Sequence, residues 1–277
     1  MTATLSSTAR PVPAAARRVA ALVRRDWRIR TSYRAAFVLD FVLGVLDLAV
    51  YYFISKTFTG ITGDLGGAPD YFAFALVGIA VTTVITAAAT GLAMRVREEQ
   101  LTGTLEALLT QPMSSTQLAL GMCAFPFVFA TVRVATYLLV GALVLSLDLS
   151  HADPLGFVVM IAAIGGAMSS IGILSGALVL VIKRGDKLAG LALFGMGLVG
   201  GAFFPVSVLP SWLEAIGKVV PTRFAFDGLR SALYVGSDWA DDALALALFT
   251  IVCLPIALWL FSRALEWGRR RGSLSQY

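Results

Sequence analysis

Six long apolar runs are the feature of this sequence that most constrains its fold. Each run is long enough, at about 1.5 Å per residue, to cross a hydrocarbon core of roughly 30 Å as an α-helix. The chain is 58% hydrophobic and 14% charged, with a mean hydropathy of +0.82, so a soluble domain could not enclose its apolar surface. The sequence therefore predicts an all-α polytopic membrane protein with a transmembrane domain at residues 35–262. The expected spans are residues 35–58, 71–94, 118–147, 155–182, 188–209 and 243–262.

The distribution of basic residues predicts the orientation of these spans. Lys and Arg number seventeen in the terminal segments and the loops after the second and fourth spans, against three in the loops on the opposite side. Because basic loops stay on the cytoplasmic side, we expect both termini in the cytoplasm and the protein in the plasma membrane. The basic residues that raise the pI to about 9.5 are then expected to face anionic lipid headgroups, and no nucleic-acid partner is expected.

The terminal segments flank the transmembrane domain. Residues 1–13 are expected to form a disordered tail, and residues 263–277 a basic cytoplasmic tail. Residues 14–34 have apolar and basic faces at helical spacing, which predicts an amphipathic interfacial helix. This helix either anchors the topology or grips a cytoplasmic partner. No apolar h-region precedes the first span, which should act as an uncleaved signal.

The passage "REEQLTGTLEALLTQPMSS", residues 97–115, is polar although apolar runs flank it. Its leucines recur at helical spacing and its acids follow another face, which predicts a short amphipathic helix at 98–110. We expect Glu98 and Glu99 in the first turn, Gly103 inside the helix, and Pro112 as its stop. The helix is too short to span, so it either rests on the bilayer surface or docks into a cytoplasmic protein. The leucine stripe consists of Leu101, Leu105, Leu108 and Leu109.

A second irregular segment, residues 206–242, precedes the last span. Two short apolar helical patterns are separated here by Pro221, which predicts an external helical hairpin at 210–236. The hairpin either re-enters the outer leaflet, with its backbone buried in protein, or lies on the outer surface as a cap.

Charged residues away from the span ends are candidates for function. Asp47 and Arg133 lie near mid-depth, where a lone charge costs about 2.5–3.5 kcal/mol on insertion scales. Both should face protein or water, and we expect them to pair, either as a structural clamp between helices or as part of a substrate pathway. Asp40 lies closer to the cytoplasmic interface.

Four glycines keep GxxxG spacing and are candidates for close helix packing. They are Gly172, Gly176, Gly197 and Gly201.

The sequence lacks the residues of an enzyme. "AIGKVV" has a lysine but not the rest of a P-loop, so this chain is not expected to bind ATP. Its one histidine, His151, cannot assemble a metal centre or a catalytic triad, and no metal is expected. Cys123 and Cys253 lie inside predicted spans and indicate no disulfide framework.

In this order of features the chain resembles the ABC-2 type permeases, the membrane subunits of ATP-driven exporters. The most specific passages are "REEQLTGTLEALLTQPMS", similar to the family's loop after the second span, and "FFPVSVLPSWLEAIGKVVPTRFAFDGLR", similar to its segment after the fifth. The resemblance covers almost the whole chain.

The resemblance implies that helix 98–110 is a coupling helix that contacts a separate ATPase subunit. It also implies a dimer of permeases, either a homodimer or a heterodimer, with two ATPase subunits that hold ATP and Mg²⁺, while this chain binds no cofactor. The first and fifth spans would line the substrate route, capped by the external hairpin. The implied ATPase contacts are Glu98, Glu99, Leu101, Thr104, Leu105, Glu106, Leu108 and Leu109.

The expected function is export of a hydrophobic small molecule, drug or lipid. With 10% aromatic residues, the sequence favours this group over polysaccharide or lipid-linked glycan export. Alternatives from other classes are an ATPase-independent channel or secondary transporter, and a membrane scaffold.

Overall fold

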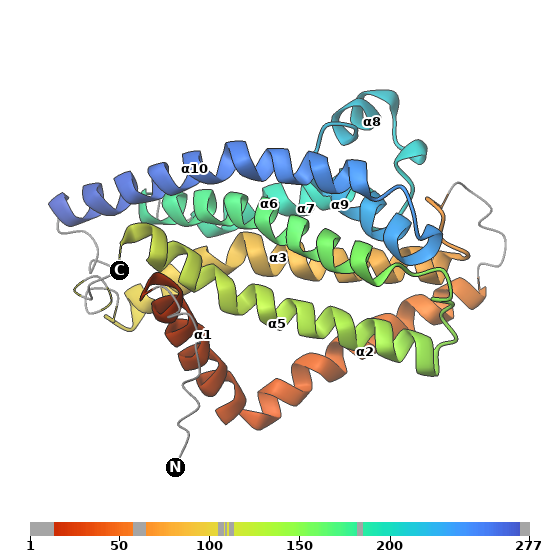
Figure 1. Cartoon of the computed structure of the whole chain (residues 1–277), viewed down its shortest axis with the longest axis horizontal. Helices are drawn as coiled ribbons and strands as arrows, with labels where there is room; N and C mark the ends of the chain where they lie inside the picture. The colour runs from red at the N-terminus through yellow and green to blue at the C-terminus, as the bar shows by residue number, and fades with distance from the viewer. Residues whose placement is uncertain are drawn as a thin grey trace, which may run out of the picture.

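The computed structural model describes residues 14–57, 65–104, 108, 110, 114–181 and 185–271, and every regular element in them is helical. The main helices lie along one another in a bundle, with α1 at an angle to it (Figure 1). The long helices are α1 (Ala14–Ser32), α2 (Arg34–Thr57), α3 (Tyr71–Leu101), α5 (Ser115–Val144), α6 (Pro154–Val181), α7 (Gly185–Val199) and α10 (Ala240–Arg271). The short elements are η1 (Val206–Val208), α8 (Ser211–Gly217), α9 (Pro221–Arg230) and the π-helical turn η2 (Ser231–Val235).

Five of the described helices are long and apolar enough to cross a membrane: α2, α3, α5, α6 and α10. The expected span at 188–209 is not one of them, so the six-span count is not confirmed. Its helix, α7, has 15 residues, which at 1.5 Å per residue gives about 22 Å. The helix ends at Val199 because Gly200 and Gly201 follow, and Gly201 adopts a φ of +92° that a helix cannot contain. Although α7 is short, α10 ends at the same end of the bundle as α1 (Figure 1).

Helix α3 forms the centre of the bundle. In its most apolar part 72% of the residues are buried, compared with 11% in α2 and 17% in α10. It packs against α5 and α6 over most of its length and contacts α2, α7 and α9. Many of its buried residues are alanines, which let neighbouring backbones approach closely. Helix α2 contacts α3 from the outside of the bundle, and most of its surface is exposed.

The segment predicted as a hairpin divides into a buried helix and an exposed one. As expected, Pro221 separates the two, because it begins α9. Phe226 and Leu229 of α9 are fully buried in the core, whereas Trp212 and Val219, in and after α8, are exposed. Only α8 therefore stands outside the bundle (Figure 1).

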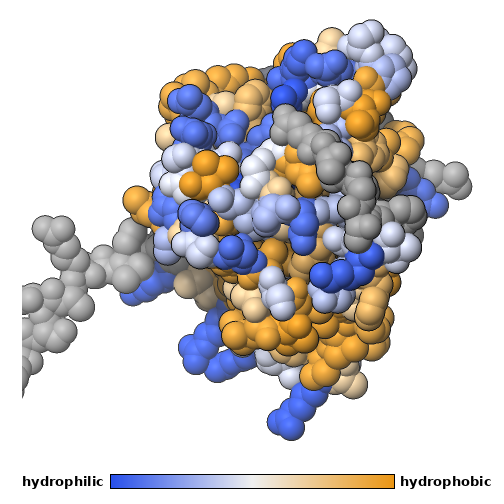
Figure 2. All heavy atoms as spheres, turned by 90° about the vertical axis from the view of Figure 1, so that its right-hand side faces the viewer, coloured by the Kyte–Doolittle hydropathy of each residue, from blue (hydrophilic) through white to orange (hydrophobic). Residues whose placement is uncertain are grey.

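Arg230 fixes the buried helix in place. Its guanidinium lies 3.7 Å from the centre of the Phe74 ring, and its Nη2 donates a hydrogen bond of 2.8 Å to the carbonyl of Gly201. The Tyr234 hydroxyl donates to the carbonyl of Ala73 at 2.9 Å. These contacts join η2 and α9 to α3 and to the turn after α7. Figure 2 views this end of the molecule, where hydrophilic residues gather over the middle and hydrophobic residues border them.

Candidate functional site

The helix predicted at 98–110 does not begin at Glu98. Instead α3 continues without a break through Glu98 and Glu99 to Leu101, because no helix-breaking residue lies between the second span and this passage. Gly103 then ends the helix with a φ of +71°, and the Thr104 N–H donates to the carbonyl of Glu99 at 3.0 Å. This is a Schellman cap, in which glycine is the favoured residue. The prediction that both glutamates lie in a first turn was wrong, since they lie in the last turn of α3.

The remaining predicted contacts of this helix are described in part. Leu101 is exposed, and Leu108 is partly buried against a core cluster formed by α3, α5, α6 and α10. The Leu108 N–H donates to the carbonyl of Thr104 at 3.0 Å. Leu105, Glu106 and Leu109 lie outside the described residues. Contact of this passage with an ATPase subunit stays a prediction.

Two glutamates in the last turn of α3 face the negative end of the helix dipole, so they require cations nearby. Arg25 of α1 donates from Nη2 to Glu99 Oε1 at 3.0 Å, and Arg95 lies 3.7 Å from Glu98. The Thr104 hydroxyl also donates to the Glu99 carboxylate. Glu99 is therefore neutralised by α1, whereas Glu98 pairs with Arg95 within α3.

Asp26 of α1 is the centre of this ionic network, and sequence analysis missed it. Its side chain is 2% exposed and lies 3.0 Å from both Arg25 and Arg95. Burial lowers the pKa of Arg25, but hydrogen bonds and charges from Asp26 and Glu99 raise it more, so Arg25 stays cationic. The available signal was that Asp26 is the single acid in the otherwise basic helix 14–32. The network ties α1 to the end of α3.

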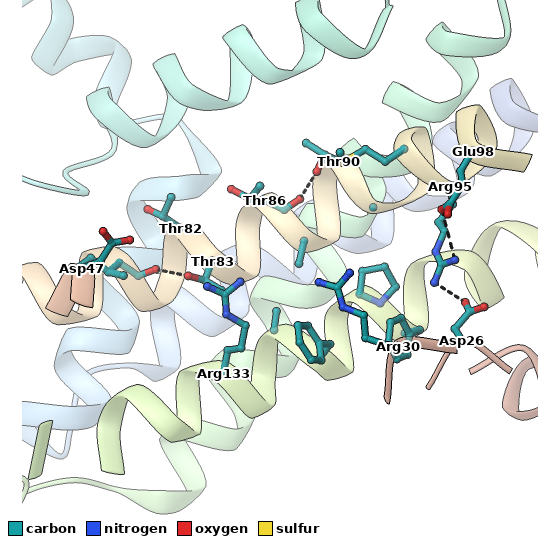
Figure 3. Close-up of a pocket in the computed structure, with 18 of the residues that line it drawn as sticks. Asp26, Arg30, Asp47, Thr82, Thr83, Thr86, Thr90, Arg95, Glu98 and Arg133 are labelled. Atoms are coloured by element: carbon teal, nitrogen blue, oxygen red, sulfur yellow. Dashed lines mark hydrogen bonds and ion pairs between the residues drawn. The ribbon is translucent and has the colours of Figure 1, made fainter. Parts of the chain in front are cut away.

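A cavity of about 720 Å³ extends from this network into the bundle, between α1, α2, α3 and α5. Figure 3 shows α3 presenting a row of threonines to it, with Arg133 of α5 reaching from the opposite side and Asp26 and Arg95 at one end. The apolar part of the wall combines aliphatic and aromatic residues. The polar lining is Asp26, Arg30, Asp47, Thr82, Thr83, Thr86, Thr90, Arg95, Glu98 and Arg133, and the aromatic lining is Tyr51, Phe125, Phe129 and Phe203.

Asp47 and Arg133 both line this cavity, but they do not pair with each other. Both nitrogens of Arg133 that form hydrogen bonds donate to the Tyr137 hydroxyl on the same helix, Nε at 3.2 Å and Nη2 at 2.6 Å. That hydroxyl lies against α2 at Gly44, where an added Cβ would be 1.9 Å from it. Asp47 is three residues further along α2, which is about 4.5 Å of helical rise. The expected direct ion pair is absent because Tyr137 holds the guanidinium one turn short of Asp47.

Asp40 has a different partner from Asp47. It forms an ion pair with Arg30, near the end of α1, and the Arg30 guanidinium lies 5.2 Å from the centre of the Phe129 ring. Asp40 therefore bridges α1 and α2 beside the cavity, which Arg30 lines.

The two predicted GxxxG pairs have different surroundings. A Cβ at Gly172 would lie 2.2 Å from the carbonyl oxygen of Ala88, and one at Gly176 would lie 2.9 Å from Leu92, so α6 is in close contact with α3. No atom lies within 4 Å of a Cβ at Gly197. Gly201 is in the turn after α7 rather than in a helix.

The charged and sulfur-containing side chains form no metal centre in the part of the chain that the structure describes. Within those residues no group of three or more His, Cys, Asp or Glu side chains could hold a metal ion. Cys123 and Cys253 are free thiols.

Residues 17–234 match the family model of the ABC-2 type transporter. Because the match covers more than half of the chain, the chain belongs to the ABC-2 type transporter family, as its two characteristic passages predicted. It is thus a multi-pass membrane permease of an ABC transporter, a class that works with an ATP-binding subunit. No curated protein matches the sequence.

Proposed function

We propose that this chain is the permease subunit of an ABC exporter that moves an amphipathic small molecule, drug or lipid out across the plasma membrane. The energy comes from ATP hydrolysed by a separate subunit, which holds ATP and Mg²⁺. The observation that carries this proposal is the cavity between α2, α3 and α5. Its volume of about 720 Å³ lies in the range of roughly 300–1,000 Å³ that suits drug-sized ligands.

The lining of the cavity supports an amphipathic substrate. Phe125 and Phe129 offer an apolar surface, whereas Thr86 and its neighbours on α3 offer hydroxyl groups. A smaller cavity of about 130 Å³ lies between α3 and α7 and shares Thr82, Thr86, Thr90 and Phe203 with the large one. The helices of the first and fifth expected spans, α2 and α7, thus each line a cavity beside α3. We take the two cavities together as the substrate route.

The ionic network supports coupling to the ATPase. Glu98 and Glu99 end α3 next to the passage that is expected to dock into the ATPase subunit. Arg25, Arg95 and Asp26 join this end to α1, and Arg30 joins α1 to α2 through Asp40. A push on the end of α3 then moves α1 and α2 as a connected unit, which is a rigid-body transition. We expect two permeases and two ATPase subunits, with both permease termini in the cytoplasm.

Filling the cavity tests this function. The change Thr86→Trp places a large ring where an exposed threonine now lines both cavities, so substrate transport should fall at least tenfold while ATP hydrolysis by the complex persists. Transport and hydrolysis are measured together in proteoliposomes that contain the permease and its ATPase. The matched control is Leu139→Trp, at an exposed position of α5 outside the cavity lining, which should leave both rates unchanged. Full transport by the Thr86 variant would mean that the route lies elsewhere.

A further inference from the structure

Two unpaired opposite charges face the cavity from different helices. Among the described residues, Asp47 of α2 forms no hydrogen bond or ion pair, and Arg133 of α5 bonds only to the Tyr137 hydroxyl. The other charged groups of the lining differ from these two. Asp26, Arg95 and Glu98 are joined in the ionic network, and Arg30 is paired with Asp40. Asp47 and Arg133 are therefore the charges that the cavity leaves available to a ligand.

The position of Arg133 suits ligand binding. A guanidinium has five N–H donors, and the Tyr137 hydroxyl accepts two of them, which leaves three for the cavity. The ring of Tyr137 is fully packed, and its hydroxyl lies against the backbone of α2 at Gly44. The guanidinium is thus held in one place by a group that does not neutralise it. Thr82 belongs to the lining of the same cavity, and its hydroxyl oxygen is buried without a hydrogen-bond partner.

Keeping two unpaired charges at mid-depth of the spans is energetically unfavourable, and direct pairing would remove most of that cost. Instead the two side chains come from different helices and do not meet, because the Tyr137 hydroxyl holds Arg133. Ionisable residues inside a membrane that face a cavity are, as a rule, functional. A ligand that carries one positive and one negative group satisfies both side chains at once. An anion would leave Asp47 unpaired and repelled, and a cation would do the same to Arg133.

We propose that the substrate is a zwitterionic amphiphile. Its anionic group binds the guanidinium of Arg133, its cationic group binds the carboxylate of Asp47, and its apolar part packs on Phe125 and Phe129. This proposal rests on the proposed export function and adds the charge pattern of the substrate. A zwitterionic membrane lipid and a soluble zwitterionic surfactant share this chemistry.

The test uses the complete transporter, permease with ATPase, in proteoliposomes. Three fluorescent lipids with the same labelled acyl chain are compared: phosphatidylcholine as the zwitterion, phosphatidylglycerol as the anion, and a trimethylammonium-propane lipid as the cation. ATP-dependent movement between leaflets is followed by quenching of the label from outside. A labelled alkyl betaine, added from the compartment that holds the ATPase, separates a soluble source from a lipid one: movement of betaine alone assigns a soluble zwitterion, and movement of phosphatidylcholine alone assigns a lipid.

The wild-type transporter should move a zwitterionic probe at least tenfold faster than either singly charged lipid, equal to about 1.4 kcal/mol. Arg133→Gln should remove this preference in favour of the cation, and Asp47→Asn in favour of the anion. The adjacent exposed positions provide controls, because Leu46→Ala and Val132→Ala lie on the same two helices outside the lining and should keep the wild-type preference.

The results that overturn the proposal are specific. Equal slowing of all probes in both charge variants would assign a structural role to the two residues. A double variant Asp47→Asn with Arg133→Gln that moves the zwitterion at the wild-type rate would show that neither charge binds the substrate. A wild-type preference for a singly charged lipid would also overturn it. Failure of the export function itself is distinguishable, because then no probe moves in response to ATP in any variant.

Discussion

Replacing Gly172 by alanine is expected to destabilise the protein by about 1–3 kcal/mol, the usual cost of overpacking. The added methyl group would lie 2.2 Å from the carbonyl oxygen of Ala88 and 3.0 Å from the Cα of Ala89. Both are backbone atoms of α3, which cannot move aside as a flexible side chain does. The α3–α6 contact must therefore open. Thermal unfolding in detergent, followed by helical circular dichroism, measures the loss.

The matched control is Gly197→Ala. Gly197 belongs to the other GxxxG pair, but no atom lies within 4 Å of its would-be methyl group. Alanine also favours a helix over glycine by roughly 1 kcal/mol, so this variant should be as stable as the wild type or slightly more stable. Equal losses at the two positions would contradict the α3–α6 packing described here.

Replacing Asp26 by asparagine is expected to have the largest effect on coupling. The change leaves Arg25 and Arg95 facing each other without the carboxylate that lies 3.0 Å from each. We expect a loss of about 2–3 kcal/mol, less than the roughly 3–5 kcal/mol for a fully buried pair, because water screens the Arg25 side chain, which is 37% exposed. With this link between α1 and α3 lost and the Arg25–Glu99 pair left to hold them, transport per ATP hydrolysed should fall at least fivefold.

Two further variants make this prediction specific. Arg28→Gln changes an exposed charge on the same helix that forms no ion pair with another described residue, so it should affect neither stability nor coupling. The double variant Asp26→Asn with Arg95→Gln removes one of the two uncompensated cations, and it should recover part of the lost stability. A stable, fully coupled Asp26→Asn protein would show that the network does not connect α1 to α3.

The long helices could be predicted from sequence because an apolar run of about 20 residues has few alternatives to a spanning helix. Five expected spans correspond to α2, α3, α5, α6 and α10 and agree with these helices to within a few residues at most ends, although α3 continues to Leu101 and α10 to Arg271. The length of the expected span at 188–209 was overestimated because hydropathy does not register the turn at Gly200 and Gly201. Pro221 correctly marked the break between α8 and α9, since proline is favoured at the first position of a helix.

The contents of the cavity could be predicted only in part. Asp47 and Arg133 were recognised because charges inside apolar runs are costly, and both line the cavity. Their separation depends on Tyr137 and Gly44, a contact between two helices that no local pattern encodes. Asp26 was missed for the same reason, because its importance comes from the ion pair with Arg95, which lies on another helix. Gly103 was placed inside a helix because leucines recur at helical spacing on both sides of it. That spacing does not show that one helix ends at Gly103.

The central claim is that this permease transports only when a separate ATPase drives it. The most direct measurement compares substrate movement in proteoliposomes that contain the permease alone, the permease with its copurifying ATPase, and the permease with an ATPase whose P-loop lysine is replaced. We predict ATP-dependent transport in the second preparation and none in the other two. Transport at the full rate by the permease alone would contradict the account.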